Sequence, residues 1–146
     1  MKISLGCDEA AYQLKETIKQ HLQKAGHEVI DNGVGEGEVE LYPDVAVRTC
    51  KKVTDGTCDR GILVCGTGIG MAMTANKVPG IRAAVCHDPF STERSVLSND
   101  ANVMCMGARV IAPQLALYLL DIWMRLTFKN GPSTPKVERI MEYQKE

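Results

Sequence analysis

The sequence lacks the features of several protein classes. Charge of one sign is not in excess, because 17 basic residues stand against 18 acidic ones and leave a formal net charge of −1. Nucleic acids and anionic membrane surfaces are bound by positive patches, so this balance argues against both partners. No apolar run approaches the roughly 20 residues of a membrane-spanning helix. The opening MKISLGCDEAAYQLK becomes acidic too early for a secretory signal. We therefore expect a cytoplasmic protein.

Metal-binding cysteine spacing is also missing. The six cysteines include no CxxC pair, and those at 7, 65, 86 and 105 lie in or at the end of apolar runs. Free cysteine in such a run packs as a small hydrophobic residue, and a structural metal site needs closely spaced ligands. We expect reduced thiols and no bound metal.

What is present is an alternation of short apolar runs with helical patterns. Its 146 residues, 45% of them hydrophobic, suffice for one domain with a proper core. This alternation predicts an α/β fold in which helices cover both faces of a parallel sheet. The expected strands are 2–7, 27–33, 61–65, 81–86 and 102–107, and the expected helices are 10–25, 42–55, 69–77, one from about 88, 113–128 and about 134–146.

Ligands of such folds bind beyond the carboxyl ends of the strands. This rule places four segments on one edge of the predicted sheet. They are residues 7–9, 65–70, 87–88 and 107–109. In the third segment we expect His87–Asp88 to cap a helix rather than to contact a ligand.

The segment GILVCGTGIGM, residues 61–71, has the strongest chemical signal. A dinucleotide fingerprint would need a glycine at Met71 and would follow the first strand, and a phosphate-binding P-loop would end in GK[ST], so neither motif fits. Three alternating glycines can bring backbone N–H groups together around a phosphate or an oxyanion that develops during a reaction. The alternative is a tight strand-to-helix turn.

Cys65 stands at the mouth of this loop, at the end of a predicted strand and before a helix. A helix N-terminus favours the thiolate, which could act as a nucleophile or as a general base. A buried core thiol is the alternative.

Several motifs together resemble one known family. CGTGIG (65–70), NKVPGIRAA (76–84) and GARVI (107–111), with GCD (6–8) and YPD (42–44), are similar in order and spacing to ribose-5-phosphate isomerase B and to the galactose-6-phosphate isomerase subunits. The resemblance extends from Ile3 to Ile140. It implies a Rossmann-like three-layer α/β/α sandwich with a five-stranded parallel sheet, a single isomerase domain over residues 1–146, and a C-terminal helix that packs on a partner subunit.

The resemblance also implies an activity. Members of this family are cofactor-independent aldose–ketose isomerases that move a proton between C1 and C2 of a phosphorylated sugar through a cis-enediolate. They are homodimers or dimers of dimers with shared active sites. By this likeness Cys65 is the base, the N–H groups from Gly66 to Gly70 hold the enediolate, and Asn99 contacts the reacting oxygens. The implied catalytic residues are Cys65, Thr67, Ser98 and Asn99, and the implied substrate-binding residues are Asp8, Glu9, Tyr42, Gly66, Gly68, Ile69, Gly70, Arg109 and Lys136.

Three departures from the family pattern concern the substrate. Glu9 stands where a phosphate-binding histidine is usual, Ser98 stands where a ring-opening histidine is usual, and the stretch 130–138, NGPSTPKVE, keeps only Lys136 as a phosphate-binding cation. A tetrose 4-phosphate cannot close a furanose and needs no ring opener, whereas ribose 5-phosphate does. The sequence therefore leaves open a ribose 5-phosphate isomerase, an erythrulose 4-phosphate isomerase, an isomerase of another five- or six-carbon sugar phosphate, or a sugar-phosphate binding protein.

Overall fold

The computed structural model describes residues 1–145 and contains one all-parallel sheet. Its strand order is β2–β1–β3–β5–β4. The strands are β1 (Lys2–Cys7), β2 (Glu28–Asp31), β3 (Arg60–Cys65), β4 (Ala83–Val85) and β5 (Val103–Gly107). The five predicted strands are confirmed, although β2 and β4 are shorter than their apolar runs suggested.

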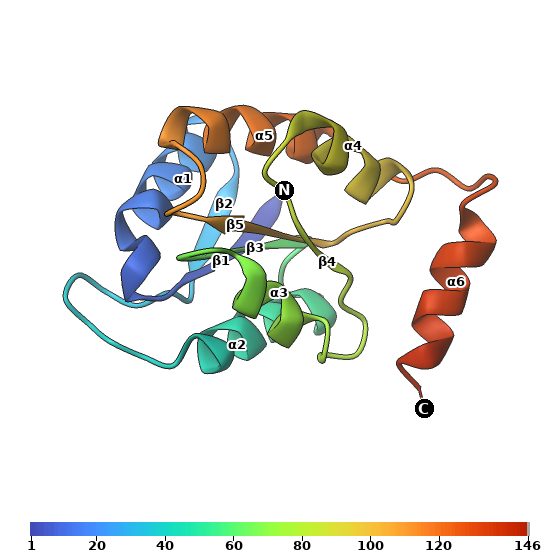
Figure 1. Cartoon of the computed structure of the whole chain (residues 1–146), viewed down its shortest axis with the longest axis horizontal. Coiled ribbons are helices and arrows are strands. Elements are labelled where there is room, and N and C mark those ends of the chain that lie inside the picture. The colour runs from blue at the N-terminus through green and yellow to red at the C-terminus, as the bar shows by residue number, and fades with distance from the viewer. Residues whose placement is uncertain (146) are drawn as a thin grey trace.

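Helices cover both faces of this sheet (Figure 1). Helices α1, α4 and α5 pack together on one face, and α2 packs against α3 on the other. This confirms the predicted three-layer α/β/α sandwich. The helices are α1 (Tyr12–Lys24, after a 3₁₀ turn at Glu9–Ala11), α2 (Tyr42–Thr54), α3 (Ile69–Ala75), α4 (Pro89–Leu97), α5 (Pro113–Arg125) and α6 (Thr134–Tyr143).

Helix α6 stands apart from the two helical layers, at the end of a long connection after α5 (Figure 1). It ends at Tyr143, earlier than expected, and Glu146 lies outside the described residues. Within residues 1–145, no helix is long and apolar enough to cross a membrane.

Local sequence explains most of the element boundaries. Residues 61–65 of β3 are continuously apolar, as suits a strand covered on both faces, and Ile62, Leu63 and Val64 are fully buried. Asp88 begins α4 as its N-cap, with its carboxylate accepting from the Ser91 N–H at 2.7 Å, and Pro89 fills the first helical position. This confirms the capping role expected for residue 88.

The parallel register brings the predicted segments to one edge. Cys7 of β1 pairs with Val64 of β3, and Cys65 pairs with Gly107 of β5. The carboxyl ends of these three central strands therefore meet, as the connectivity predicts. We call this the carboxyl edge, and the opposite side of the sheet the amino edge.

Candidate active site at the carboxyl edge

The loop after β3 is built around Cys65 and Gly68. Gly68 has a φ of +77°, in the left-handed region, and a Cβ there would lie 2.9 Å from the backbone carbon of Met106. Only glycine fits without strain, so the chain can turn tightly over β5. The turn directs the Gly68 N–H toward the Cys65 Sγ, 3.1 Å away. This N–H is aimed at the atom that carries negative charge in a thiolate.

Cys65 is buried with the hydrophobic core, at the end of β3. Its residue is 6% exposed, at the end of β3, and its carbonyl accepts from the Ala108 N–H at 2.8 Å. The backbone is thus held rigidly while the sulfur lies at the sheet edge. The hydroxyl of Thr67 accepts from the Ile69 N–H at 3.3 Å, which shapes the start of α3. Such a loop can present backbone donors to a small anion.

Tyr42 lies directly against this loop although it is distant in sequence. It is the first residue of α2, and a Cβ added to Gly70 would lie only 2.6 Å from its Oη. The absence of a side chain at Gly70 therefore makes room for the aromatic ring. The predicted pair is brought together by the packing of α2 on α3.

Two charged side chains, Arg109 and Asp8, lie on the other side of the loop. The guanidinium of Arg109 crosses Gly66, where a Cβ would lie 3.2 Å from Nη1. Asp8 is buried and accepts from the Ala10 N–H at 3.1 Å. Burial and the charge of Glu9 raise the pKa of Asp8, and the charge of Arg109 opposes this rise. A carboxyl and a cation therefore lie at the same edge as the loop.

His87 does not cap a helix, as the sequence predicted, but contacts the end of β5. Its Nε2 accepts from the Gly107 N–H at 2.9 Å, so the ring holds the end of β5 beside the loop. Partial burial lowers its pKa from 6.5, against the opposing charge of Asp88. Capping of α4 falls to Asp88 alone. The position of His87 directly after a predicted strand placed it at this edge. Its hydrogen-bond partner is the backbone N–H of Gly107, which no pattern in the sequence marks.

Three predicted site residues do not lie at this edge. Ser98 and Asn99 directly follow α4, and β5 begins a few residues later at its amino end. At that amino edge the Asn102 Oδ1 accepts from the Arg82 N–H at 2.8 Å. Lys136 is in the first turn of α6, whose Gln144 bonds to Gly80 and Ile81 at that same edge. Strand β5 alone separates the two edges by about 13 Å.

A sizeable cavity also lies away from Cys65. Its volume is about 600 Å³, and it lies beside β4, with Asn99, Arg94 and Arg82 among its lining residues and none from 65–70. Ser98 accepts from the Arg94 Nη1 at 3.4 Å nearby. Within residues 1–145 no cluster of three or more His, Cys, Asp or Glu side chains could hold a metal ion.

Comparison with known proteins identifies the family. The profile of the Ribose/Galactose Isomerase family matches residues 3–140. The chain belongs to this family. It is 51% identical over 142 residues to Ribose-5-P isomerase B of Listeria innocua, covering 97% of this chain and 96% of that one. It is 48% identical over 145 residues to D-erythrulose-4-phosphate isomerase of Pectobacterium atrosepticum, covering 99% and 95%.

A solved structure of the same family has the same fold. Ribose-5-phosphate isomerase B of Clostridium thermocellum superposes with a TM-score of 0.97 at 44% sequence identity, covering 99% of this chain and 98% of the other. The resemblance drawn from the sequence motifs is thereby confirmed, and the Ribose/Galactose Isomerase relatives are sugar-phosphate isomerases, which are enzymes.

Proposed function

We propose that this chain is a cofactor-independent aldose–ketose isomerase of the ribose 5-phosphate/ribulose 5-phosphate type. The observation that carries the proposal is the Cys65–Gly70 loop, in which a backbone N–H meets the thiol, with Tyr42 against Gly70 and Arg109 against Gly66. Proton abstraction beside a carbonyl needs a base and fixed donors at the developing oxyanion. This loop offers both.

In the proposed mechanism the open-chain aldose binds with C2 beside Cys65. The thiolate takes the C2 proton, the electron pair of that bond forms the C1–C2 double bond, and negative charge moves to the carbonyl oxygen. Backbone N–H groups from Gly66 to Gly70 and the Thr67 hydroxyl stabilise the resulting cis-enediolate. The thiol then returns the proton to C1, while a proton is exchanged between the two oxygens, and ketose is released.

The remaining predicted contacts bind the rest of the sugar phosphate. Asp8 and Tyr42 contact hydroxyl groups, and Arg109 and Lys136 bind the phosphate. Glu9 is exposed beside Asp8 and would face a hydroxyl or a cation rather than the phosphate. Six free cysteines fit a reducing compartment such as the cytoplasm.

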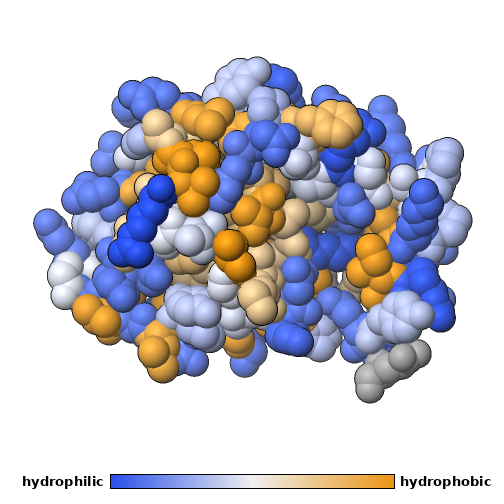
Figure 2. All heavy atoms as spheres, in the orientation of Figure 1, coloured by the Kyte–Doolittle hydropathy of each residue, from blue (hydrophilic) through white to orange (hydrophobic). Residues whose placement is uncertain are grey.

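A second copy of the chain completes the site in this proposal, as a homodimer or a dimer of dimers. Ser98, Asn99 and Lys136 lie at the amino edge and cannot reach Cys65 of the same chain. Large apolar side chains remain exposed beside the loop, with Ile69 at 55% and Met73 at 66%. Figure 2 shows apolar residues gathered on the viewed face between α3 and α4. A partner that packs on this surface brings its own Asn99 to the loop.

One specific residue favours a second candidate substrate. Ser98 stands where ribose 5-phosphate needs a ring-opening group, and one of the two relatives at about half identity is named D-erythrulose-4-phosphate isomerase. An erythrulose 4-phosphate/erythrose 4-phosphate pair stays open-chain and requires no such group. Other five- or six-carbon sugar phosphates and a sugar-phosphate binding protein are the further alternatives.

The decisive experiment compares kcat/KM on ribose 5-phosphate, allose 6-phosphate, galactose 6-phosphate and erythrulose 4-phosphate. We expect isomerisation of at least one, with a preference for the pentose supporting the first candidate and for the tetrose the second. Cys65→Ala should lower kcat at least about 100-fold, because a general base contributes that much or more, while substrate binding changes little.

Cys58→Ala is the matched control, because Cys58 is also nearly buried but precedes β3, at the amino edge. It should retain wild-type kcat. Full activity of Cys65→Ala would contradict the assignment of the base. Binding without turnover of every substrate by the wild-type protein would leave only the binding-protein alternative.

A further inference from the structure

The segment between β2 and α2 leads directly into Tyr42, the first residue of α2. Residues 32–41 contain no helix or strand, and Val39 and Leu41 are 78% and 75% exposed. Leu41, the N-cap of α2, makes no capping hydrogen bond with its side chain. The position of Tyr42 at the start of α2 therefore depends on contacts made elsewhere along this segment.

Arg48 supplies those contacts from the second turn of α2. Its Nε donates to the Asn32 carbonyl at 2.8 Å, and its Nη2 donates to the Glu40 Oε2 at 2.7 Å. Its Nη1 also bonds to the Glu40 Oε1. One guanidinium thus joins the first residue of the segment to its ninth. Only arginine has a planar fork that can make all three bonds together.

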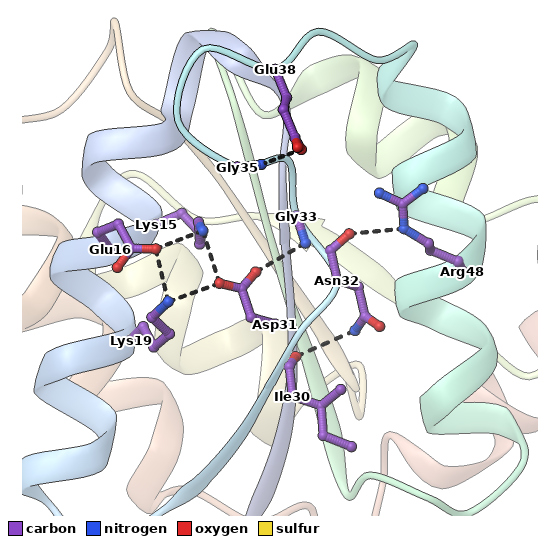
Figure 3. A network of polar contacts seen from close by, with 10 residues as sticks. All are labelled: Lys15, Glu16, Lys19, Ile30, Asp31, Asn32, Gly33, Gly35, Glu38 and Arg48. Carbon is purple, nitrogen blue, oxygen red and sulfur yellow. Dashed lines mark hydrogen bonds and ion pairs between the residues drawn. The ribbon is translucent and has the colours of Figure 1, made fainter.

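Asn32, whose bond from Arg48 is drawn in Figure 3, is itself attached to the sheet. The Asn32 N–H donates to the Leu5 carbonyl at 2.7 Å, and its Nδ2 donates to the Ser4 Oγ at 2.8 Å. The preceding Asp31 accepts from the ammonium groups of Lys15 and Lys19, at 2.8 and 2.9 Å. Because Asn32 is fixed, the guanidinium bonded to it also restricts where Glu40 can lie.

Glu40 is two residues before Tyr42, whose ring fits over Gly70 beside the thiol loop. Holding Glu40 therefore restricts the entry of the chain into α2 and the placement of the ring. We propose that Arg48 is a positioning residue that, with Glu40, holds Tyr42 in its substrate-binding place. This inference rests on the proposed function, in which Tyr42 contacts the sugar.

The test is the kinetics of Arg48→Met on the preferred sugar phosphate. We expect KM to rise about tenfold, with kcat within about twofold, because ground-state binding by Tyr42 is weakened but the Cys65 loop is untouched. Arg48→Lys should raise KM less, because an ammonium still reaches Glu40 without bridging to Asn32. In a Tyr42→Ala background, Arg48→Met should raise KM by less than about twofold, since contacting residues are not additive.

Hydrogen exchange of residues 33–41 provides a readout that does not depend on activity. Exchange there should quicken in Arg48→Met, while thermal stability falls only slightly. Lys2→Met is the matched control, because it removes an exposed cation from an ion pair with Glu28 at the amino edge. If Arg48→Met is insoluble, Glu40→Ala replaces it with the same expectations.

Two results would overturn the inference. One is an unchanged KM together with unchanged exchange in Arg48→Met, and the other is a KM effect that persists in full without the Tyr42 ring. A wild-type protein inactive on every substrate would instead refute the proposed function. Accelerated exchange in Arg48→Met would still show that the Arg48 bridge between Asn32 and Glu40 orders residues 33–41.

Discussion

At the scale of single residues, the six cysteines show how position decides the chemistry of a thiol. Burial raises the pKa of Cys7 to about 11 and of Cys50 to about 12, and it also raises the pKa of the fully buried Cys105 well above its usual range. These groups remain neutral thiols at physiological pH and act as core residues. Cys65 begins the glycine loop after β3, and the Gly68 N–H lies 3.1 Å from its sulfur.

His87 leads to a prediction about pH. Its folded-state pKa is below 6.5, so between the two values the unfolded chain binds a proton that the folded chain does not. The contribution of His87 to stability is therefore complete above the unfolded pKa and is lost as pH falls through the folded pKa. Protonation of Nε2 would also break its bond with the Gly107 N–H. We expect acid to destabilise the native state partly through this ring.

His87→Gln tests this by replacing the imidazole with a side chain that accepts a hydrogen bond but does not titrate. The free energy of unfolding, measured in urea from about pH 8 to about pH 5, should fall less steeply than in the wild type below about pH 6.5. The measurement at pH 8 gives the internal reference. Parallel curves for the two proteins would show that His87 does not titrate as inferred.

At the scale of elements, two glycines beside the same loop have different partners. A Cβ at Gly70 would meet the far end of the Tyr42 side chain, which can move aside. A Cβ at Gly107 would lie 2.7 Å from the backbone of Thr67, which cannot move without shifting the loop. A side chain at Gly70 would therefore disturb Tyr42 and the substrate binding proposed for it. A side chain at Gly107 would disturb the packing of β5 on the loop.

The two alanine substitutions should therefore separate function from stability. Gly70→Ala should raise KM several-fold with little change in the midpoint of urea unfolding, since alanine also favours the helix by about 1 kcal/mol. Gly107→Ala should lower the free energy of unfolding by about 1–3 kcal/mol through overpacking. Similar unfolding midpoints for both variants, or an unchanged KM for Gly70→Ala, would contradict this assignment.

At the scale of the whole molecule, the predicted site is split between two edges of one sheet. Cys65 is at the carboxyl edge, and Asn99 opens into the cavity at the amino edge. The turn that carries Asn99 is well held, because Asp100, with a φ of 50°, bonds to the Arg82 guanidinium through both its carbonyl and its carboxylate. A rearrangement within one chain would break these bonds, which supports the proposal that a second copy of the chain supplies Asn99 to the Cys65 loop.

Mixing inactive variants tests this arrangement. Cys65→Ala and Asn99→Ala should each be inactive alone, but mixed dimers made by refolding them together contain one intact site. Random mixing gives about half mixed dimers, and hence about a quarter of wild-type activity. Cys65→Ala mixed with Thr67→Ala is the control, since both changes lie in one loop and no intact site can form. No recovery in the first mixture would refute the shared site.

The sequence by itself determined the alternation of elements, the carboxyl-edge segments and the loop around Cys65. These follow from local properties, because apolar periodicity, helix caps such as Asp88 and a left-handed glycine at Gly68 act within a few residues. The family motifs have the same character. They are contiguous stretches, and three of them, GCD, CGTGIG and GARVI, lie at the carboxyl ends of β1, β3 and β5.

Only the tertiary structure decided which distant groups meet. The bond from Gly107 to His87, the Arg48 bridge between Asn32 and Glu40, and the Tyr42 ring over Gly70 all join segments that the sequence does not mark as partners. It also separated Asn99 from Cys65, although the family resemblance assigns both to one catalytic site. The physical reason is that these contacts depend on sheet register and helix packing, which the whole chain sets together.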